Sequence, residues 1–195
     1  MMSPDSDLSI RSAAIQQYRK AVSKFYMFDT TGLFIEHWFR MPKNGLIPNK
    51  LDIHPREMLP LLPGVIMLER HGGHDDYRIR LMGTANAARW GFDATNASYL
   101  NFIASHNGET VRESLKLLHK FPCGVLLSGN ELYTSGRTVR CETILFPVRT
   151  NEAGREILFG FIAAEENDSA SEGDILAYCA ITKSQYVNIG GGAPD

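Results

Sequence analysis

The most regular hydrophobic pattern in the chain lies near its N-terminus. Over residues 9–28, apolar side chains recur every three or four positions, which is the spacing of one face of an α-helix. This pattern predicts an amphipathic helix with an apolar stripe. The residues of the stripe that we expect at an interface are Ile10, Ala14, Tyr18, Val22 and Phe25.

A second, shorter helix is predicted over residues 31–40. It should end before residues 42–48, where two prolines and a glycine favour turns because proline fixes φ and lacks an N–H donor. An irregular connector then follows, and Asp52 is placed to cap a helical turn over residues 54–57.

From residue 65 onwards the pattern changes to short apolar runs separated by turn residues. The five predicted strands are 65–69, 77–84, 124–133, 137–148 and 156–164. The first two should form a hairpin and the last three an antiparallel meander, because Ser135-Gly136 and the polar residues 150–154 are typical of tight turns. Helices are predicted between the two groups, over residues 85–90 and 107–120.

This order of elements predicts an α+β fold, in which helices cover one face of a five-stranded antiparallel sheet. We divide the chain into an N-terminal helix (residues 1–30), a central domain (31–165) and a partly flexible C-terminal extension (166–195). The extension is acidic at first and regains apolar character from residue 175, and the pattern assigns it no secondary structure.

Four phrases carry a resemblance to a known family: WFRMP (38–42), LPLLP (59–63), YRIRLMGT (77–84) and RWG (89–91). Their order and spacing resemble the short stand-alone PAS-like proteins of proteobacteria, over residues 33–165. The resemblance implies a sensory domain with a small-molecule cavity, a homodimer formed through the N-terminal helix, and a separate signalling partner. It does not identify a ligand or cofactor.

Strand alternation together with the PAS plan predicts which residues line the cavity. They are Leu81, Thr84, Trp90, Phe102, Leu115, Leu118, Val125, Leu127, Cys141, Thr143, Phe159 and Phe161. A filled hydrophobic core uses the same residue types and is an equally good interpretation. A register shift of one residue would exchange the strand members of the set.

Arg78 and Arg80 alternate with apolar residues on one predicted strand. This is ordinary strand amphipathicity if they face solvent. If the helices cover their side of the sheet, the two guanidinium groups would instead form an anion site.

The composition excludes several classes of function. A net charge of −2 gives no reason to expect binding to nucleic acid or to an anionic membrane, and no apolar run approaches the length of a membrane helix. Three widely spaced cysteines, Cys123, Cys141 and Cys179, without a CxxC pair predict reduced thiols rather than a disulfide or zinc site. With no secretory signal in the N-terminal sequence, we expect a cytoplasmic protein.

Candidate catalytic and metal-binding residues are few. The histidines at positions 71 and 74 are expected in a solvated hairpin loop. Haem-binding members of the PAS group use a helical histidine as the iron ligand, and the resemblance implies His106 and His119 as the only candidates in the corresponding stretch. His54 beside Glu57 could act as an acid–base pair, but an exposed helix start explains both residues. No GxSxG motif or phosphate-binding glycine loop occurs.

We therefore predict a non-catalytic sensory domain that binds a small molecule, a protein partner, or both. The alternatives are a small α+β enzyme that uses the same apolar cavity and a ligand-free interaction adaptor. An enzyme should place a titratable group deep in its cavity, and the predicted lining contains none.

Overall fold

The computed structural model describes residues 28–43, 45–71, 76–165 and 173–194. Its helices are α2 (Asp29–Arg40), α3 (Thr84–Trp90) and α4 (Gly108–Lys120), with short 3-10 turns between them. Its strands are β1 (Val65–His71), β2 (Arg78–Met82), β3 (Cys123–Tyr133), β4 (Thr138–Val148), β5 (Arg155–Ala164) and β6 (Leu176–Asn188). The predicted amphipathic helix and its interface residues lie outside the described residues.

The strands form one antiparallel sheet in the order β2-β1-β5-β4-β3-β6. The predicted hairpin and meander are both present. The prediction of five strands is wrong by one, because residues 176–188 add β6 beside β3. Much of β6 is half-exposed or exposed, so its sequence lacks the clear apolar alternation that reveals a strand with a buried face.

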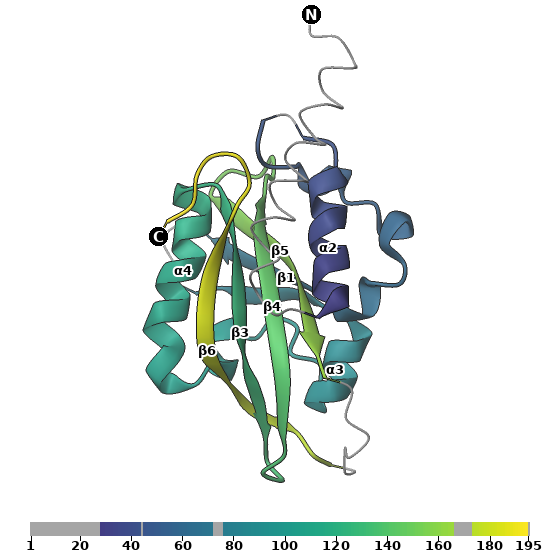
Figure 1. The fold of residues 1–195 in the computed structure, drawn as a ribbon, viewed down its shortest axis with the longest axis vertical. Helices are drawn as coiled ribbons and strands as arrows, with labels where there is room; N and C mark the ends of the chain where they lie inside the picture. Colours follow the sequence, from purple (N-terminus) through teal and green to yellow (C-terminus); the bar gives the residue numbers. More distant parts are fainter. Residues whose placement is uncertain (1–27, 44, 72–75, 166–172, 195) are drawn as a thin grey trace, which may run out of the picture.

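Both faces of the sheet are covered, whereas the sequence predicted helices on one face only. Figure 1 shows α4 and α2 on opposite sides of the sheet. We call the face packed against α3 and α4 the inner face and the face packed against α2 the outer face. Because side chains alternate along a strand, Leu145 of β4 joins the inner core while its neighbours Ile144 and Phe146 join the outer core.

Helix α2 covers the outer face through its aromatic residues. Trp38 stacks on Phe146 of β4 with ring centroids 4.4 Å apart, and Phe34 stacks on Phe161 of β5 at 5.5 Å. The Lys43 ammonium then donates hydrogen bonds to the Trp38 and Phe39 carbonyls at 2.6 and 3.0 Å. A cation at these last carbonyls stabilises the C-terminal end of the helix, where the Met41 N–H also donates to the Trp38 carbonyl at 3.3 Å.

Loops partly cover the two edge strands of the sheet, β2 and β6. The Asn107 amide bonds the Ile181 backbone of β6 in both directions, donating to its carbonyl at 3.0 Å and accepting from its N–H at 2.9 Å. On β2, Ile79 exchanges backbone hydrogen bonds with Asn96 and Ala97. These contacts satisfy strand groups that would otherwise be open to pairing with another chain.

The connector before β1 differs from its prediction. Asp52 does not cap the turn Pro55–Met58; its carboxylate accepts from the Asn49 backbone N–H at 3.2 Å and stabilises the preceding turn, Lys50–Asp52. Both turns are 3-10 helices. Among the described helices, none is long and apolar enough to cross a membrane.

Candidate functional site

A cavity of about 730 Å³ opens on the outer face, beside the β1–β2 edge of the sheet. This volume is in the range of sites that hold small organic molecules. Strands β1, β2 and β5, the first residue of α3 and the 3-10 turns of the connector form its walls. The lining residues are Lys50, Ile53, Pro55, Met58, Leu59, Leu62, Pro63, Val65, Met67, Leu81, Met82, Gly83, Thr84 and Phe159.

The walls meet because of a glycine. Gly83 donates its N–H to the Val65 carbonyl at 2.8 Å, directly before α3 begins. A Cβ atom at this position would lie 2.3 Å from the Pro63 carbonyl oxygen, so the approach requires glycine. The segments with the sequences YRIRLMGT and LPLLP therefore contact each other at Gly83 and Pro63. This contact holds the connector against the sheet.

The chemistry of the lining is almost wholly apolar. Met58 and Met67 contribute flexible thioethers, which adapt to ligands of irregular shape. The Met82 sulfur instead accepts from the Ala94 N–H at 3.3 Å, and its side chain packs against the inner core. Among the described residues, Lys50 is the single charged member of the lining, and no carboxylate or imidazole contributes to it. The cavity can thus bind an apolar body but offers no pair of groups for acid–base chemistry.

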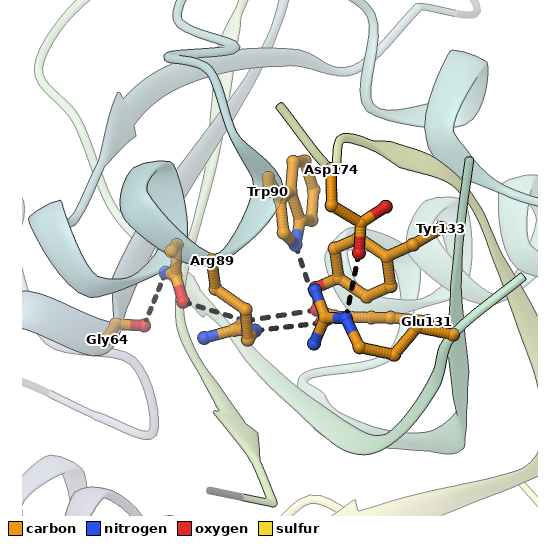
Figure 2. A network of polar contacts seen from close by, with 8 residues as sticks. Gly64, Arg89, Trp90, Glu131, Tyr133 and Asp174 are labelled. Carbon is orange, nitrogen blue, oxygen red and sulfur yellow. Dashed lines mark hydrogen bonds and ion pairs between the residues drawn. The ribbon is translucent and has the colours of Figure 1, made fainter. Parts of the chain in front are cut away.

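A buried polar network lies on the other side of the cavity wall, centred on Glu131 of β3 (Figure 2). The Glu131 side chain is fully buried, and its carboxylate accepts from both Nε and Nη2 of Arg89 at 2.8 and 3.0 Å. It also accepts from the Trp90 indole N–H at 2.8 Å and the Tyr133 hydroxyl at 2.7 Å. Four donors compensate for the cost of burying this charge.

The network shifts the pKa values of Arg89 and Tyr133. Burial alone would lower the pKa of Arg89, but the hydrogen bonds and charge of Glu131 outweigh burial and raise it. Burial raises the pKa of Tyr133, and the adjacent Glu131 carboxylate raises it further. Arg89 therefore stays charged and Tyr133 neutral at physiological pH.

Asn86 joins this network to the cavity. The Arg89 guanidinium donates to the Asn86 side-chain oxygen at 3.1 Å, and the Asn86 amide donates to the Gly64 carbonyl at 2.9 Å (Figure 2). A longer bond of 3.3 Å reaches the carbonyl of Val65, which lines the cavity. A continuous set of hydrogen bonds thus runs from the cavity wall to β3.

At its far end the network meets the β3–β4 hairpin and the start of β6. The Arg137 guanidinium lies 3.7 Å from the centre of the Tyr133 ring and pairs with Asp174 at 2.9 Å. Asp174 also accepts from the Ser135 backbone N–H at 3.1 Å. A displacement of Tyr133 would therefore reach the tip of the hairpin.

The structure divides the predicted lining residues between the two faces. Leu81, Thr84 and Phe159 line the outer-face cavity. The larger group lies in or against the inner core: Trp90, Phe102, Leu115, Leu118, Val125 and Leu127 belong to this group. Cys141 and Thr143 are buried on β4. They lie on the same face of the strand as the inner-core residues Val139 and Leu145, because residues two apart along a strand point to the same side.

The structure places Phe159 and Phe161 on the other face of the sheet from the one that the sequence predicted. Both were predicted to line the same cavity as the inner-face residues, but they belong to the outer core. Residues 157–163 are apolar on both faces of β5, so alternation carried no information about which face was which.

The two arginines of β2 are not covered by the helices. Arg78 lies 3.2 Å from Asp76 and Arg80 lies 3.9 Å from Glu69, and their side chains are 63% and 55% exposed. Each guanidinium thus has a carboxylate of its own chain nearby.

The described histidines and thiols form no metal site. His54, Glu57 and His106 are exposed. Burial lowers the pKa of His119 to about 4, with the neighbouring Glu156 opposing the shift and Arg70 adding to it. Within the described part of the chain, no group of three or more potential metal ligands occurs, and the loop of residues 72–75 lies outside that part.

Two of the buried thiols lie close together across a strand. Cys141 on β4 and Cys179 on β6 are separated by β3, where Gly129 pairs with Cys141. The hydrogen bond between the thiols and their burial raise the pKa of Cys179. Two strand spacings alone separate the Cα atoms by roughly 9–10 Å, and Cys179 pairs with Glu131, two residues along β3 from Gly129. This separation is beyond the reach of a disulfide.

Sequence reasoning missed Lys50, the three cavity methionines and the Glu131 network. Glu131 did leave a trace in the sequence, since an acidic residue at an inward-facing strand position requires a buried partner. The arginine of the RWG phrase supplies that partner. The cavity left no such trace, because the connector shows no periodicity.

Comparison with known proteins now identifies the class. A family model described as PAS domain matches residues 27–163, and the chain belongs to this family. Among solved structures, that of a single-residue variant of RsLOV is similar with a TM-score of 0.42 and 10% identity, over 60% of this chain and 70% of that one. Comparison with curated protein sequences finds no match.

Proposed function

We propose that this PAS domain is a non-catalytic sensor that binds an apolar small molecule in the outer-face cavity. The observation that carries the proposal is the cavity itself, about 730 Å³ in volume and lined by aliphatic, methionine and proline side chains. Membership of the PAS family supports the sensory role. The PAS-based expectation of an inner-face site is not adopted, because aromatic and aliphatic side chains and the Glu131 network occupy that side.

The lack of catalysis is part of this proposal. Acid–base chemistry needs a titratable group that can reach the ligand. Lys50 is the one ionisable side chain that the described part of the chain contributes to the lining. The Glu131 carboxylate is already held by four donors behind the cavity wall. The alternative of a small enzyme would need a second reactive group that this cavity does not present.

The Glu131 network is the element that we expect to report occupancy. A ligand that displaces the Gly64–Val65 backbone also disturbs the Asn86 bonds, and Asn86 positions Arg89. Signals would then appear at the β3–β4 hairpin, where a separate protein partner could detect them. The expected cytoplasmic location and the homodimer through Ile10 to Phe25 remain predictions.

The proposal is tested by native mass spectrometry of the full chain purified from cells. We expect an additional non-covalent mass in the wild type. Leu81→Trp fills the cavity from its rim, so the additional mass should be lost; Leu33→Trp, at a 56% exposed position on α2 outside the lining, should retain it.

The outcomes separate the proposal from its alternatives. An additional mass that survives Leu81→Trp would place the ligand elsewhere. A wild type without any additional mass, and without binding of added apolar ligands, would favour the ligand-free adaptor. Leu59 and Leu81 of the lining support that second function, since they are 62% and 45% exposed.

A further inference from the structure

Lys50 stands out among the fourteen residues that line the outer-face cavity, because it carries their single charge. Among the described residues, none presents a carboxylate within ion-pair distance of its ammonium group. The lysine is partly buried. An ammonium group beside an apolar cavity is solvated on one side and can pair with an anion on the other.

The backbone of Lys50 is fixed. Its N–H donates to the Arg149 carbonyl at 2.8 Å, and the Arg149 N–H returns a bond to the Pro48 carbonyl at 2.9 Å. The capping box of Asn49 and Asp52 closes the same turn. The lysine therefore starts from a defined position at the cavity, which limits the loss of entropy when it binds a charged group.

The rest of the lining favours an aliphatic ligand over a flat aromatic one. Phe159 is the one aromatic residue among the fourteen described lining residues, whereas methionine and leucine make up much of the wall. Aromatic ligands are usually held by stacking on aromatic side chains. Flexible methionine walls adapt instead to a chain with many rotamers.

We propose that the ligand is an amphipathic monocarboxylic acid, with its alkyl chain in the cavity and its carboxylate paired with Lys50. This inference rests on the proposed function and names the ligand class for the same site. Alkyl burial should supply most of the affinity. Lys50 should supply the preference for an acid over a neutral head group.

The two contributions have different magnitudes. Each methylene group that enters the cavity should tighten binding about fourfold until the cavity is full. An ion pair at a partly exposed lysine should add only about fivefold. Binding of the acid, but not of the matching alcohol, should also weaken with added salt.

The test is isothermal titration calorimetry of the full chain with dodecanoate and with dodecanol, each below its aggregation concentration. In the wild type we expect dodecanoate to bind about fivefold tighter than dodecanol. Lys50→Met should remove this difference by weakening dodecanoate binding alone. Lys116→Met on α4, which removes the same charge from a residue outside the lining, should leave it intact.

The outcomes distinguish the inference from the proposed function. Equal binding of acid and alcohol, or a Lys50→Met variant that keeps the preference for the acid, overturns the inference and leaves the apolar cavity site standing. If neither compound binds and no apolar ligand co-purifies, both the inference and the proposed function are overturned.

Discussion

Glu131 shows how one buried residue can connect distant segments. Its carboxylate is fully buried and receives donors from α3 and from its own strand. A buried ion pair is not a strong source of stability in itself, but removal of one partner leaves an uncompensated charge. Glu131 and Arg89 should therefore be strongly coupled in a double-mutant cycle.

We expect Glu131→Met to lower the free energy of unfolding by about 3–5 kcal/mol. Adding Arg89→Met should recover part of this loss, because it removes the unpaired guanidinium, and the coupling energy should exceed about 2 kcal/mol. Urea denaturation measures all four proteins. The exposed Glu113–Lys116 pair on α4, at 3.0 Å, is the control and should give at most about 0.5 kcal/mol. Additive effects of Glu131→Met and Arg89→Met would contradict the network.

His119 gives the fold a dependence on pH. Its Nε2 is buried and has no hydrogen-bond partner among the described residues, and burial lowers its pKa from 6.5 to about 4. Between these two values the unfolded chain binds more protons than the folded one. Protonation therefore favours unfolding, and the stability contributed by neutral His119 is lost as the pH falls through this window.

We expect the free energy of unfolding to fall by about 1–2 kcal/mol from pH 8 to pH 5 because of His119. Urea denaturation at a series of pH values measures this loss. His119→Gln should show a correspondingly flatter profile. His106→Gln, which changes an exposed histidine, should keep the wild-type slope. The same slope in the wild type and in His119→Gln would show that another group controls the dependence.

At the scale of elements, β6 is held by contacts with other segments, which cannot be predicted from the sequence of the strand itself. The strand pairs with β3 on one side, and the Asn107 side chain bonds Ile181 on the other. Asn107 thus replaces part of a neighbouring strand. A side-chain amide can do this because it carries a donor and an acceptor at nearly the spacing of a peptide group.

Asn107→Ala should therefore cost about 1–2 kcal/mol of stability and increase hydrogen exchange at the Ile181 amide. Asn101→Ala changes an exposed asparagine in the preceding 3-10 turn and should stay within about 0.5 kcal/mol of the wild type. Unchanged exchange at Ile181 in Asn107→Ala would mean that the amide does not hold the strand.

The elements also show what the sequence could predict and why. Apolar periodicity and turn residues predict strands β1 to β5 and helices α2, α3 and α4. The structure confirms these elements within a few residues. Strand β6 was not predicted, because much of it is half-exposed or exposed and its sequence lacks a clear apolar alternation. The sequence could not predict which side chains of β5 point to which face of the sheet, because both faces are buried. Phe159 and Phe161 were therefore assigned to the inner side, whereas they belong to the outer core.

The candidate site was harder to predict than the fold. Leu81, Thr84 and Phe159 do line the outer-face cavity, but that they bind a ligand is still a prediction. Lys50 and Met58 lie on 3-10 turns whose position depends on tertiary contacts, above all the approach of Gly83 to Pro63. Local sequence patterns carry no information about such a contact.

At the scale of the whole molecule, the sheet separates two layers with different roles. The inner layer holds α4, Trp90 of α3 and the Glu131 network, and the outer layer holds α2, the connector and the cavity. Figure 1 shows α4 and α2 on opposite sides of the sheet. The Asn86 bonds to Gly64 and Val65 join the two layers beside β1. A ligand on one side could thus affect the hairpin on the other.

The central claim is that ligand occupies the outer-face cavity rather than the inner side of this PAS domain. Hydrogen–deuterium exchange of the full chain, with and without dodecanoate, tests it most directly. We predict slower exchange in residues 50–64 and unchanged exchange in residues 99–107, which pack on the inner side. Protection of residues 99–107 with no change in residues 50–64 would contradict the account.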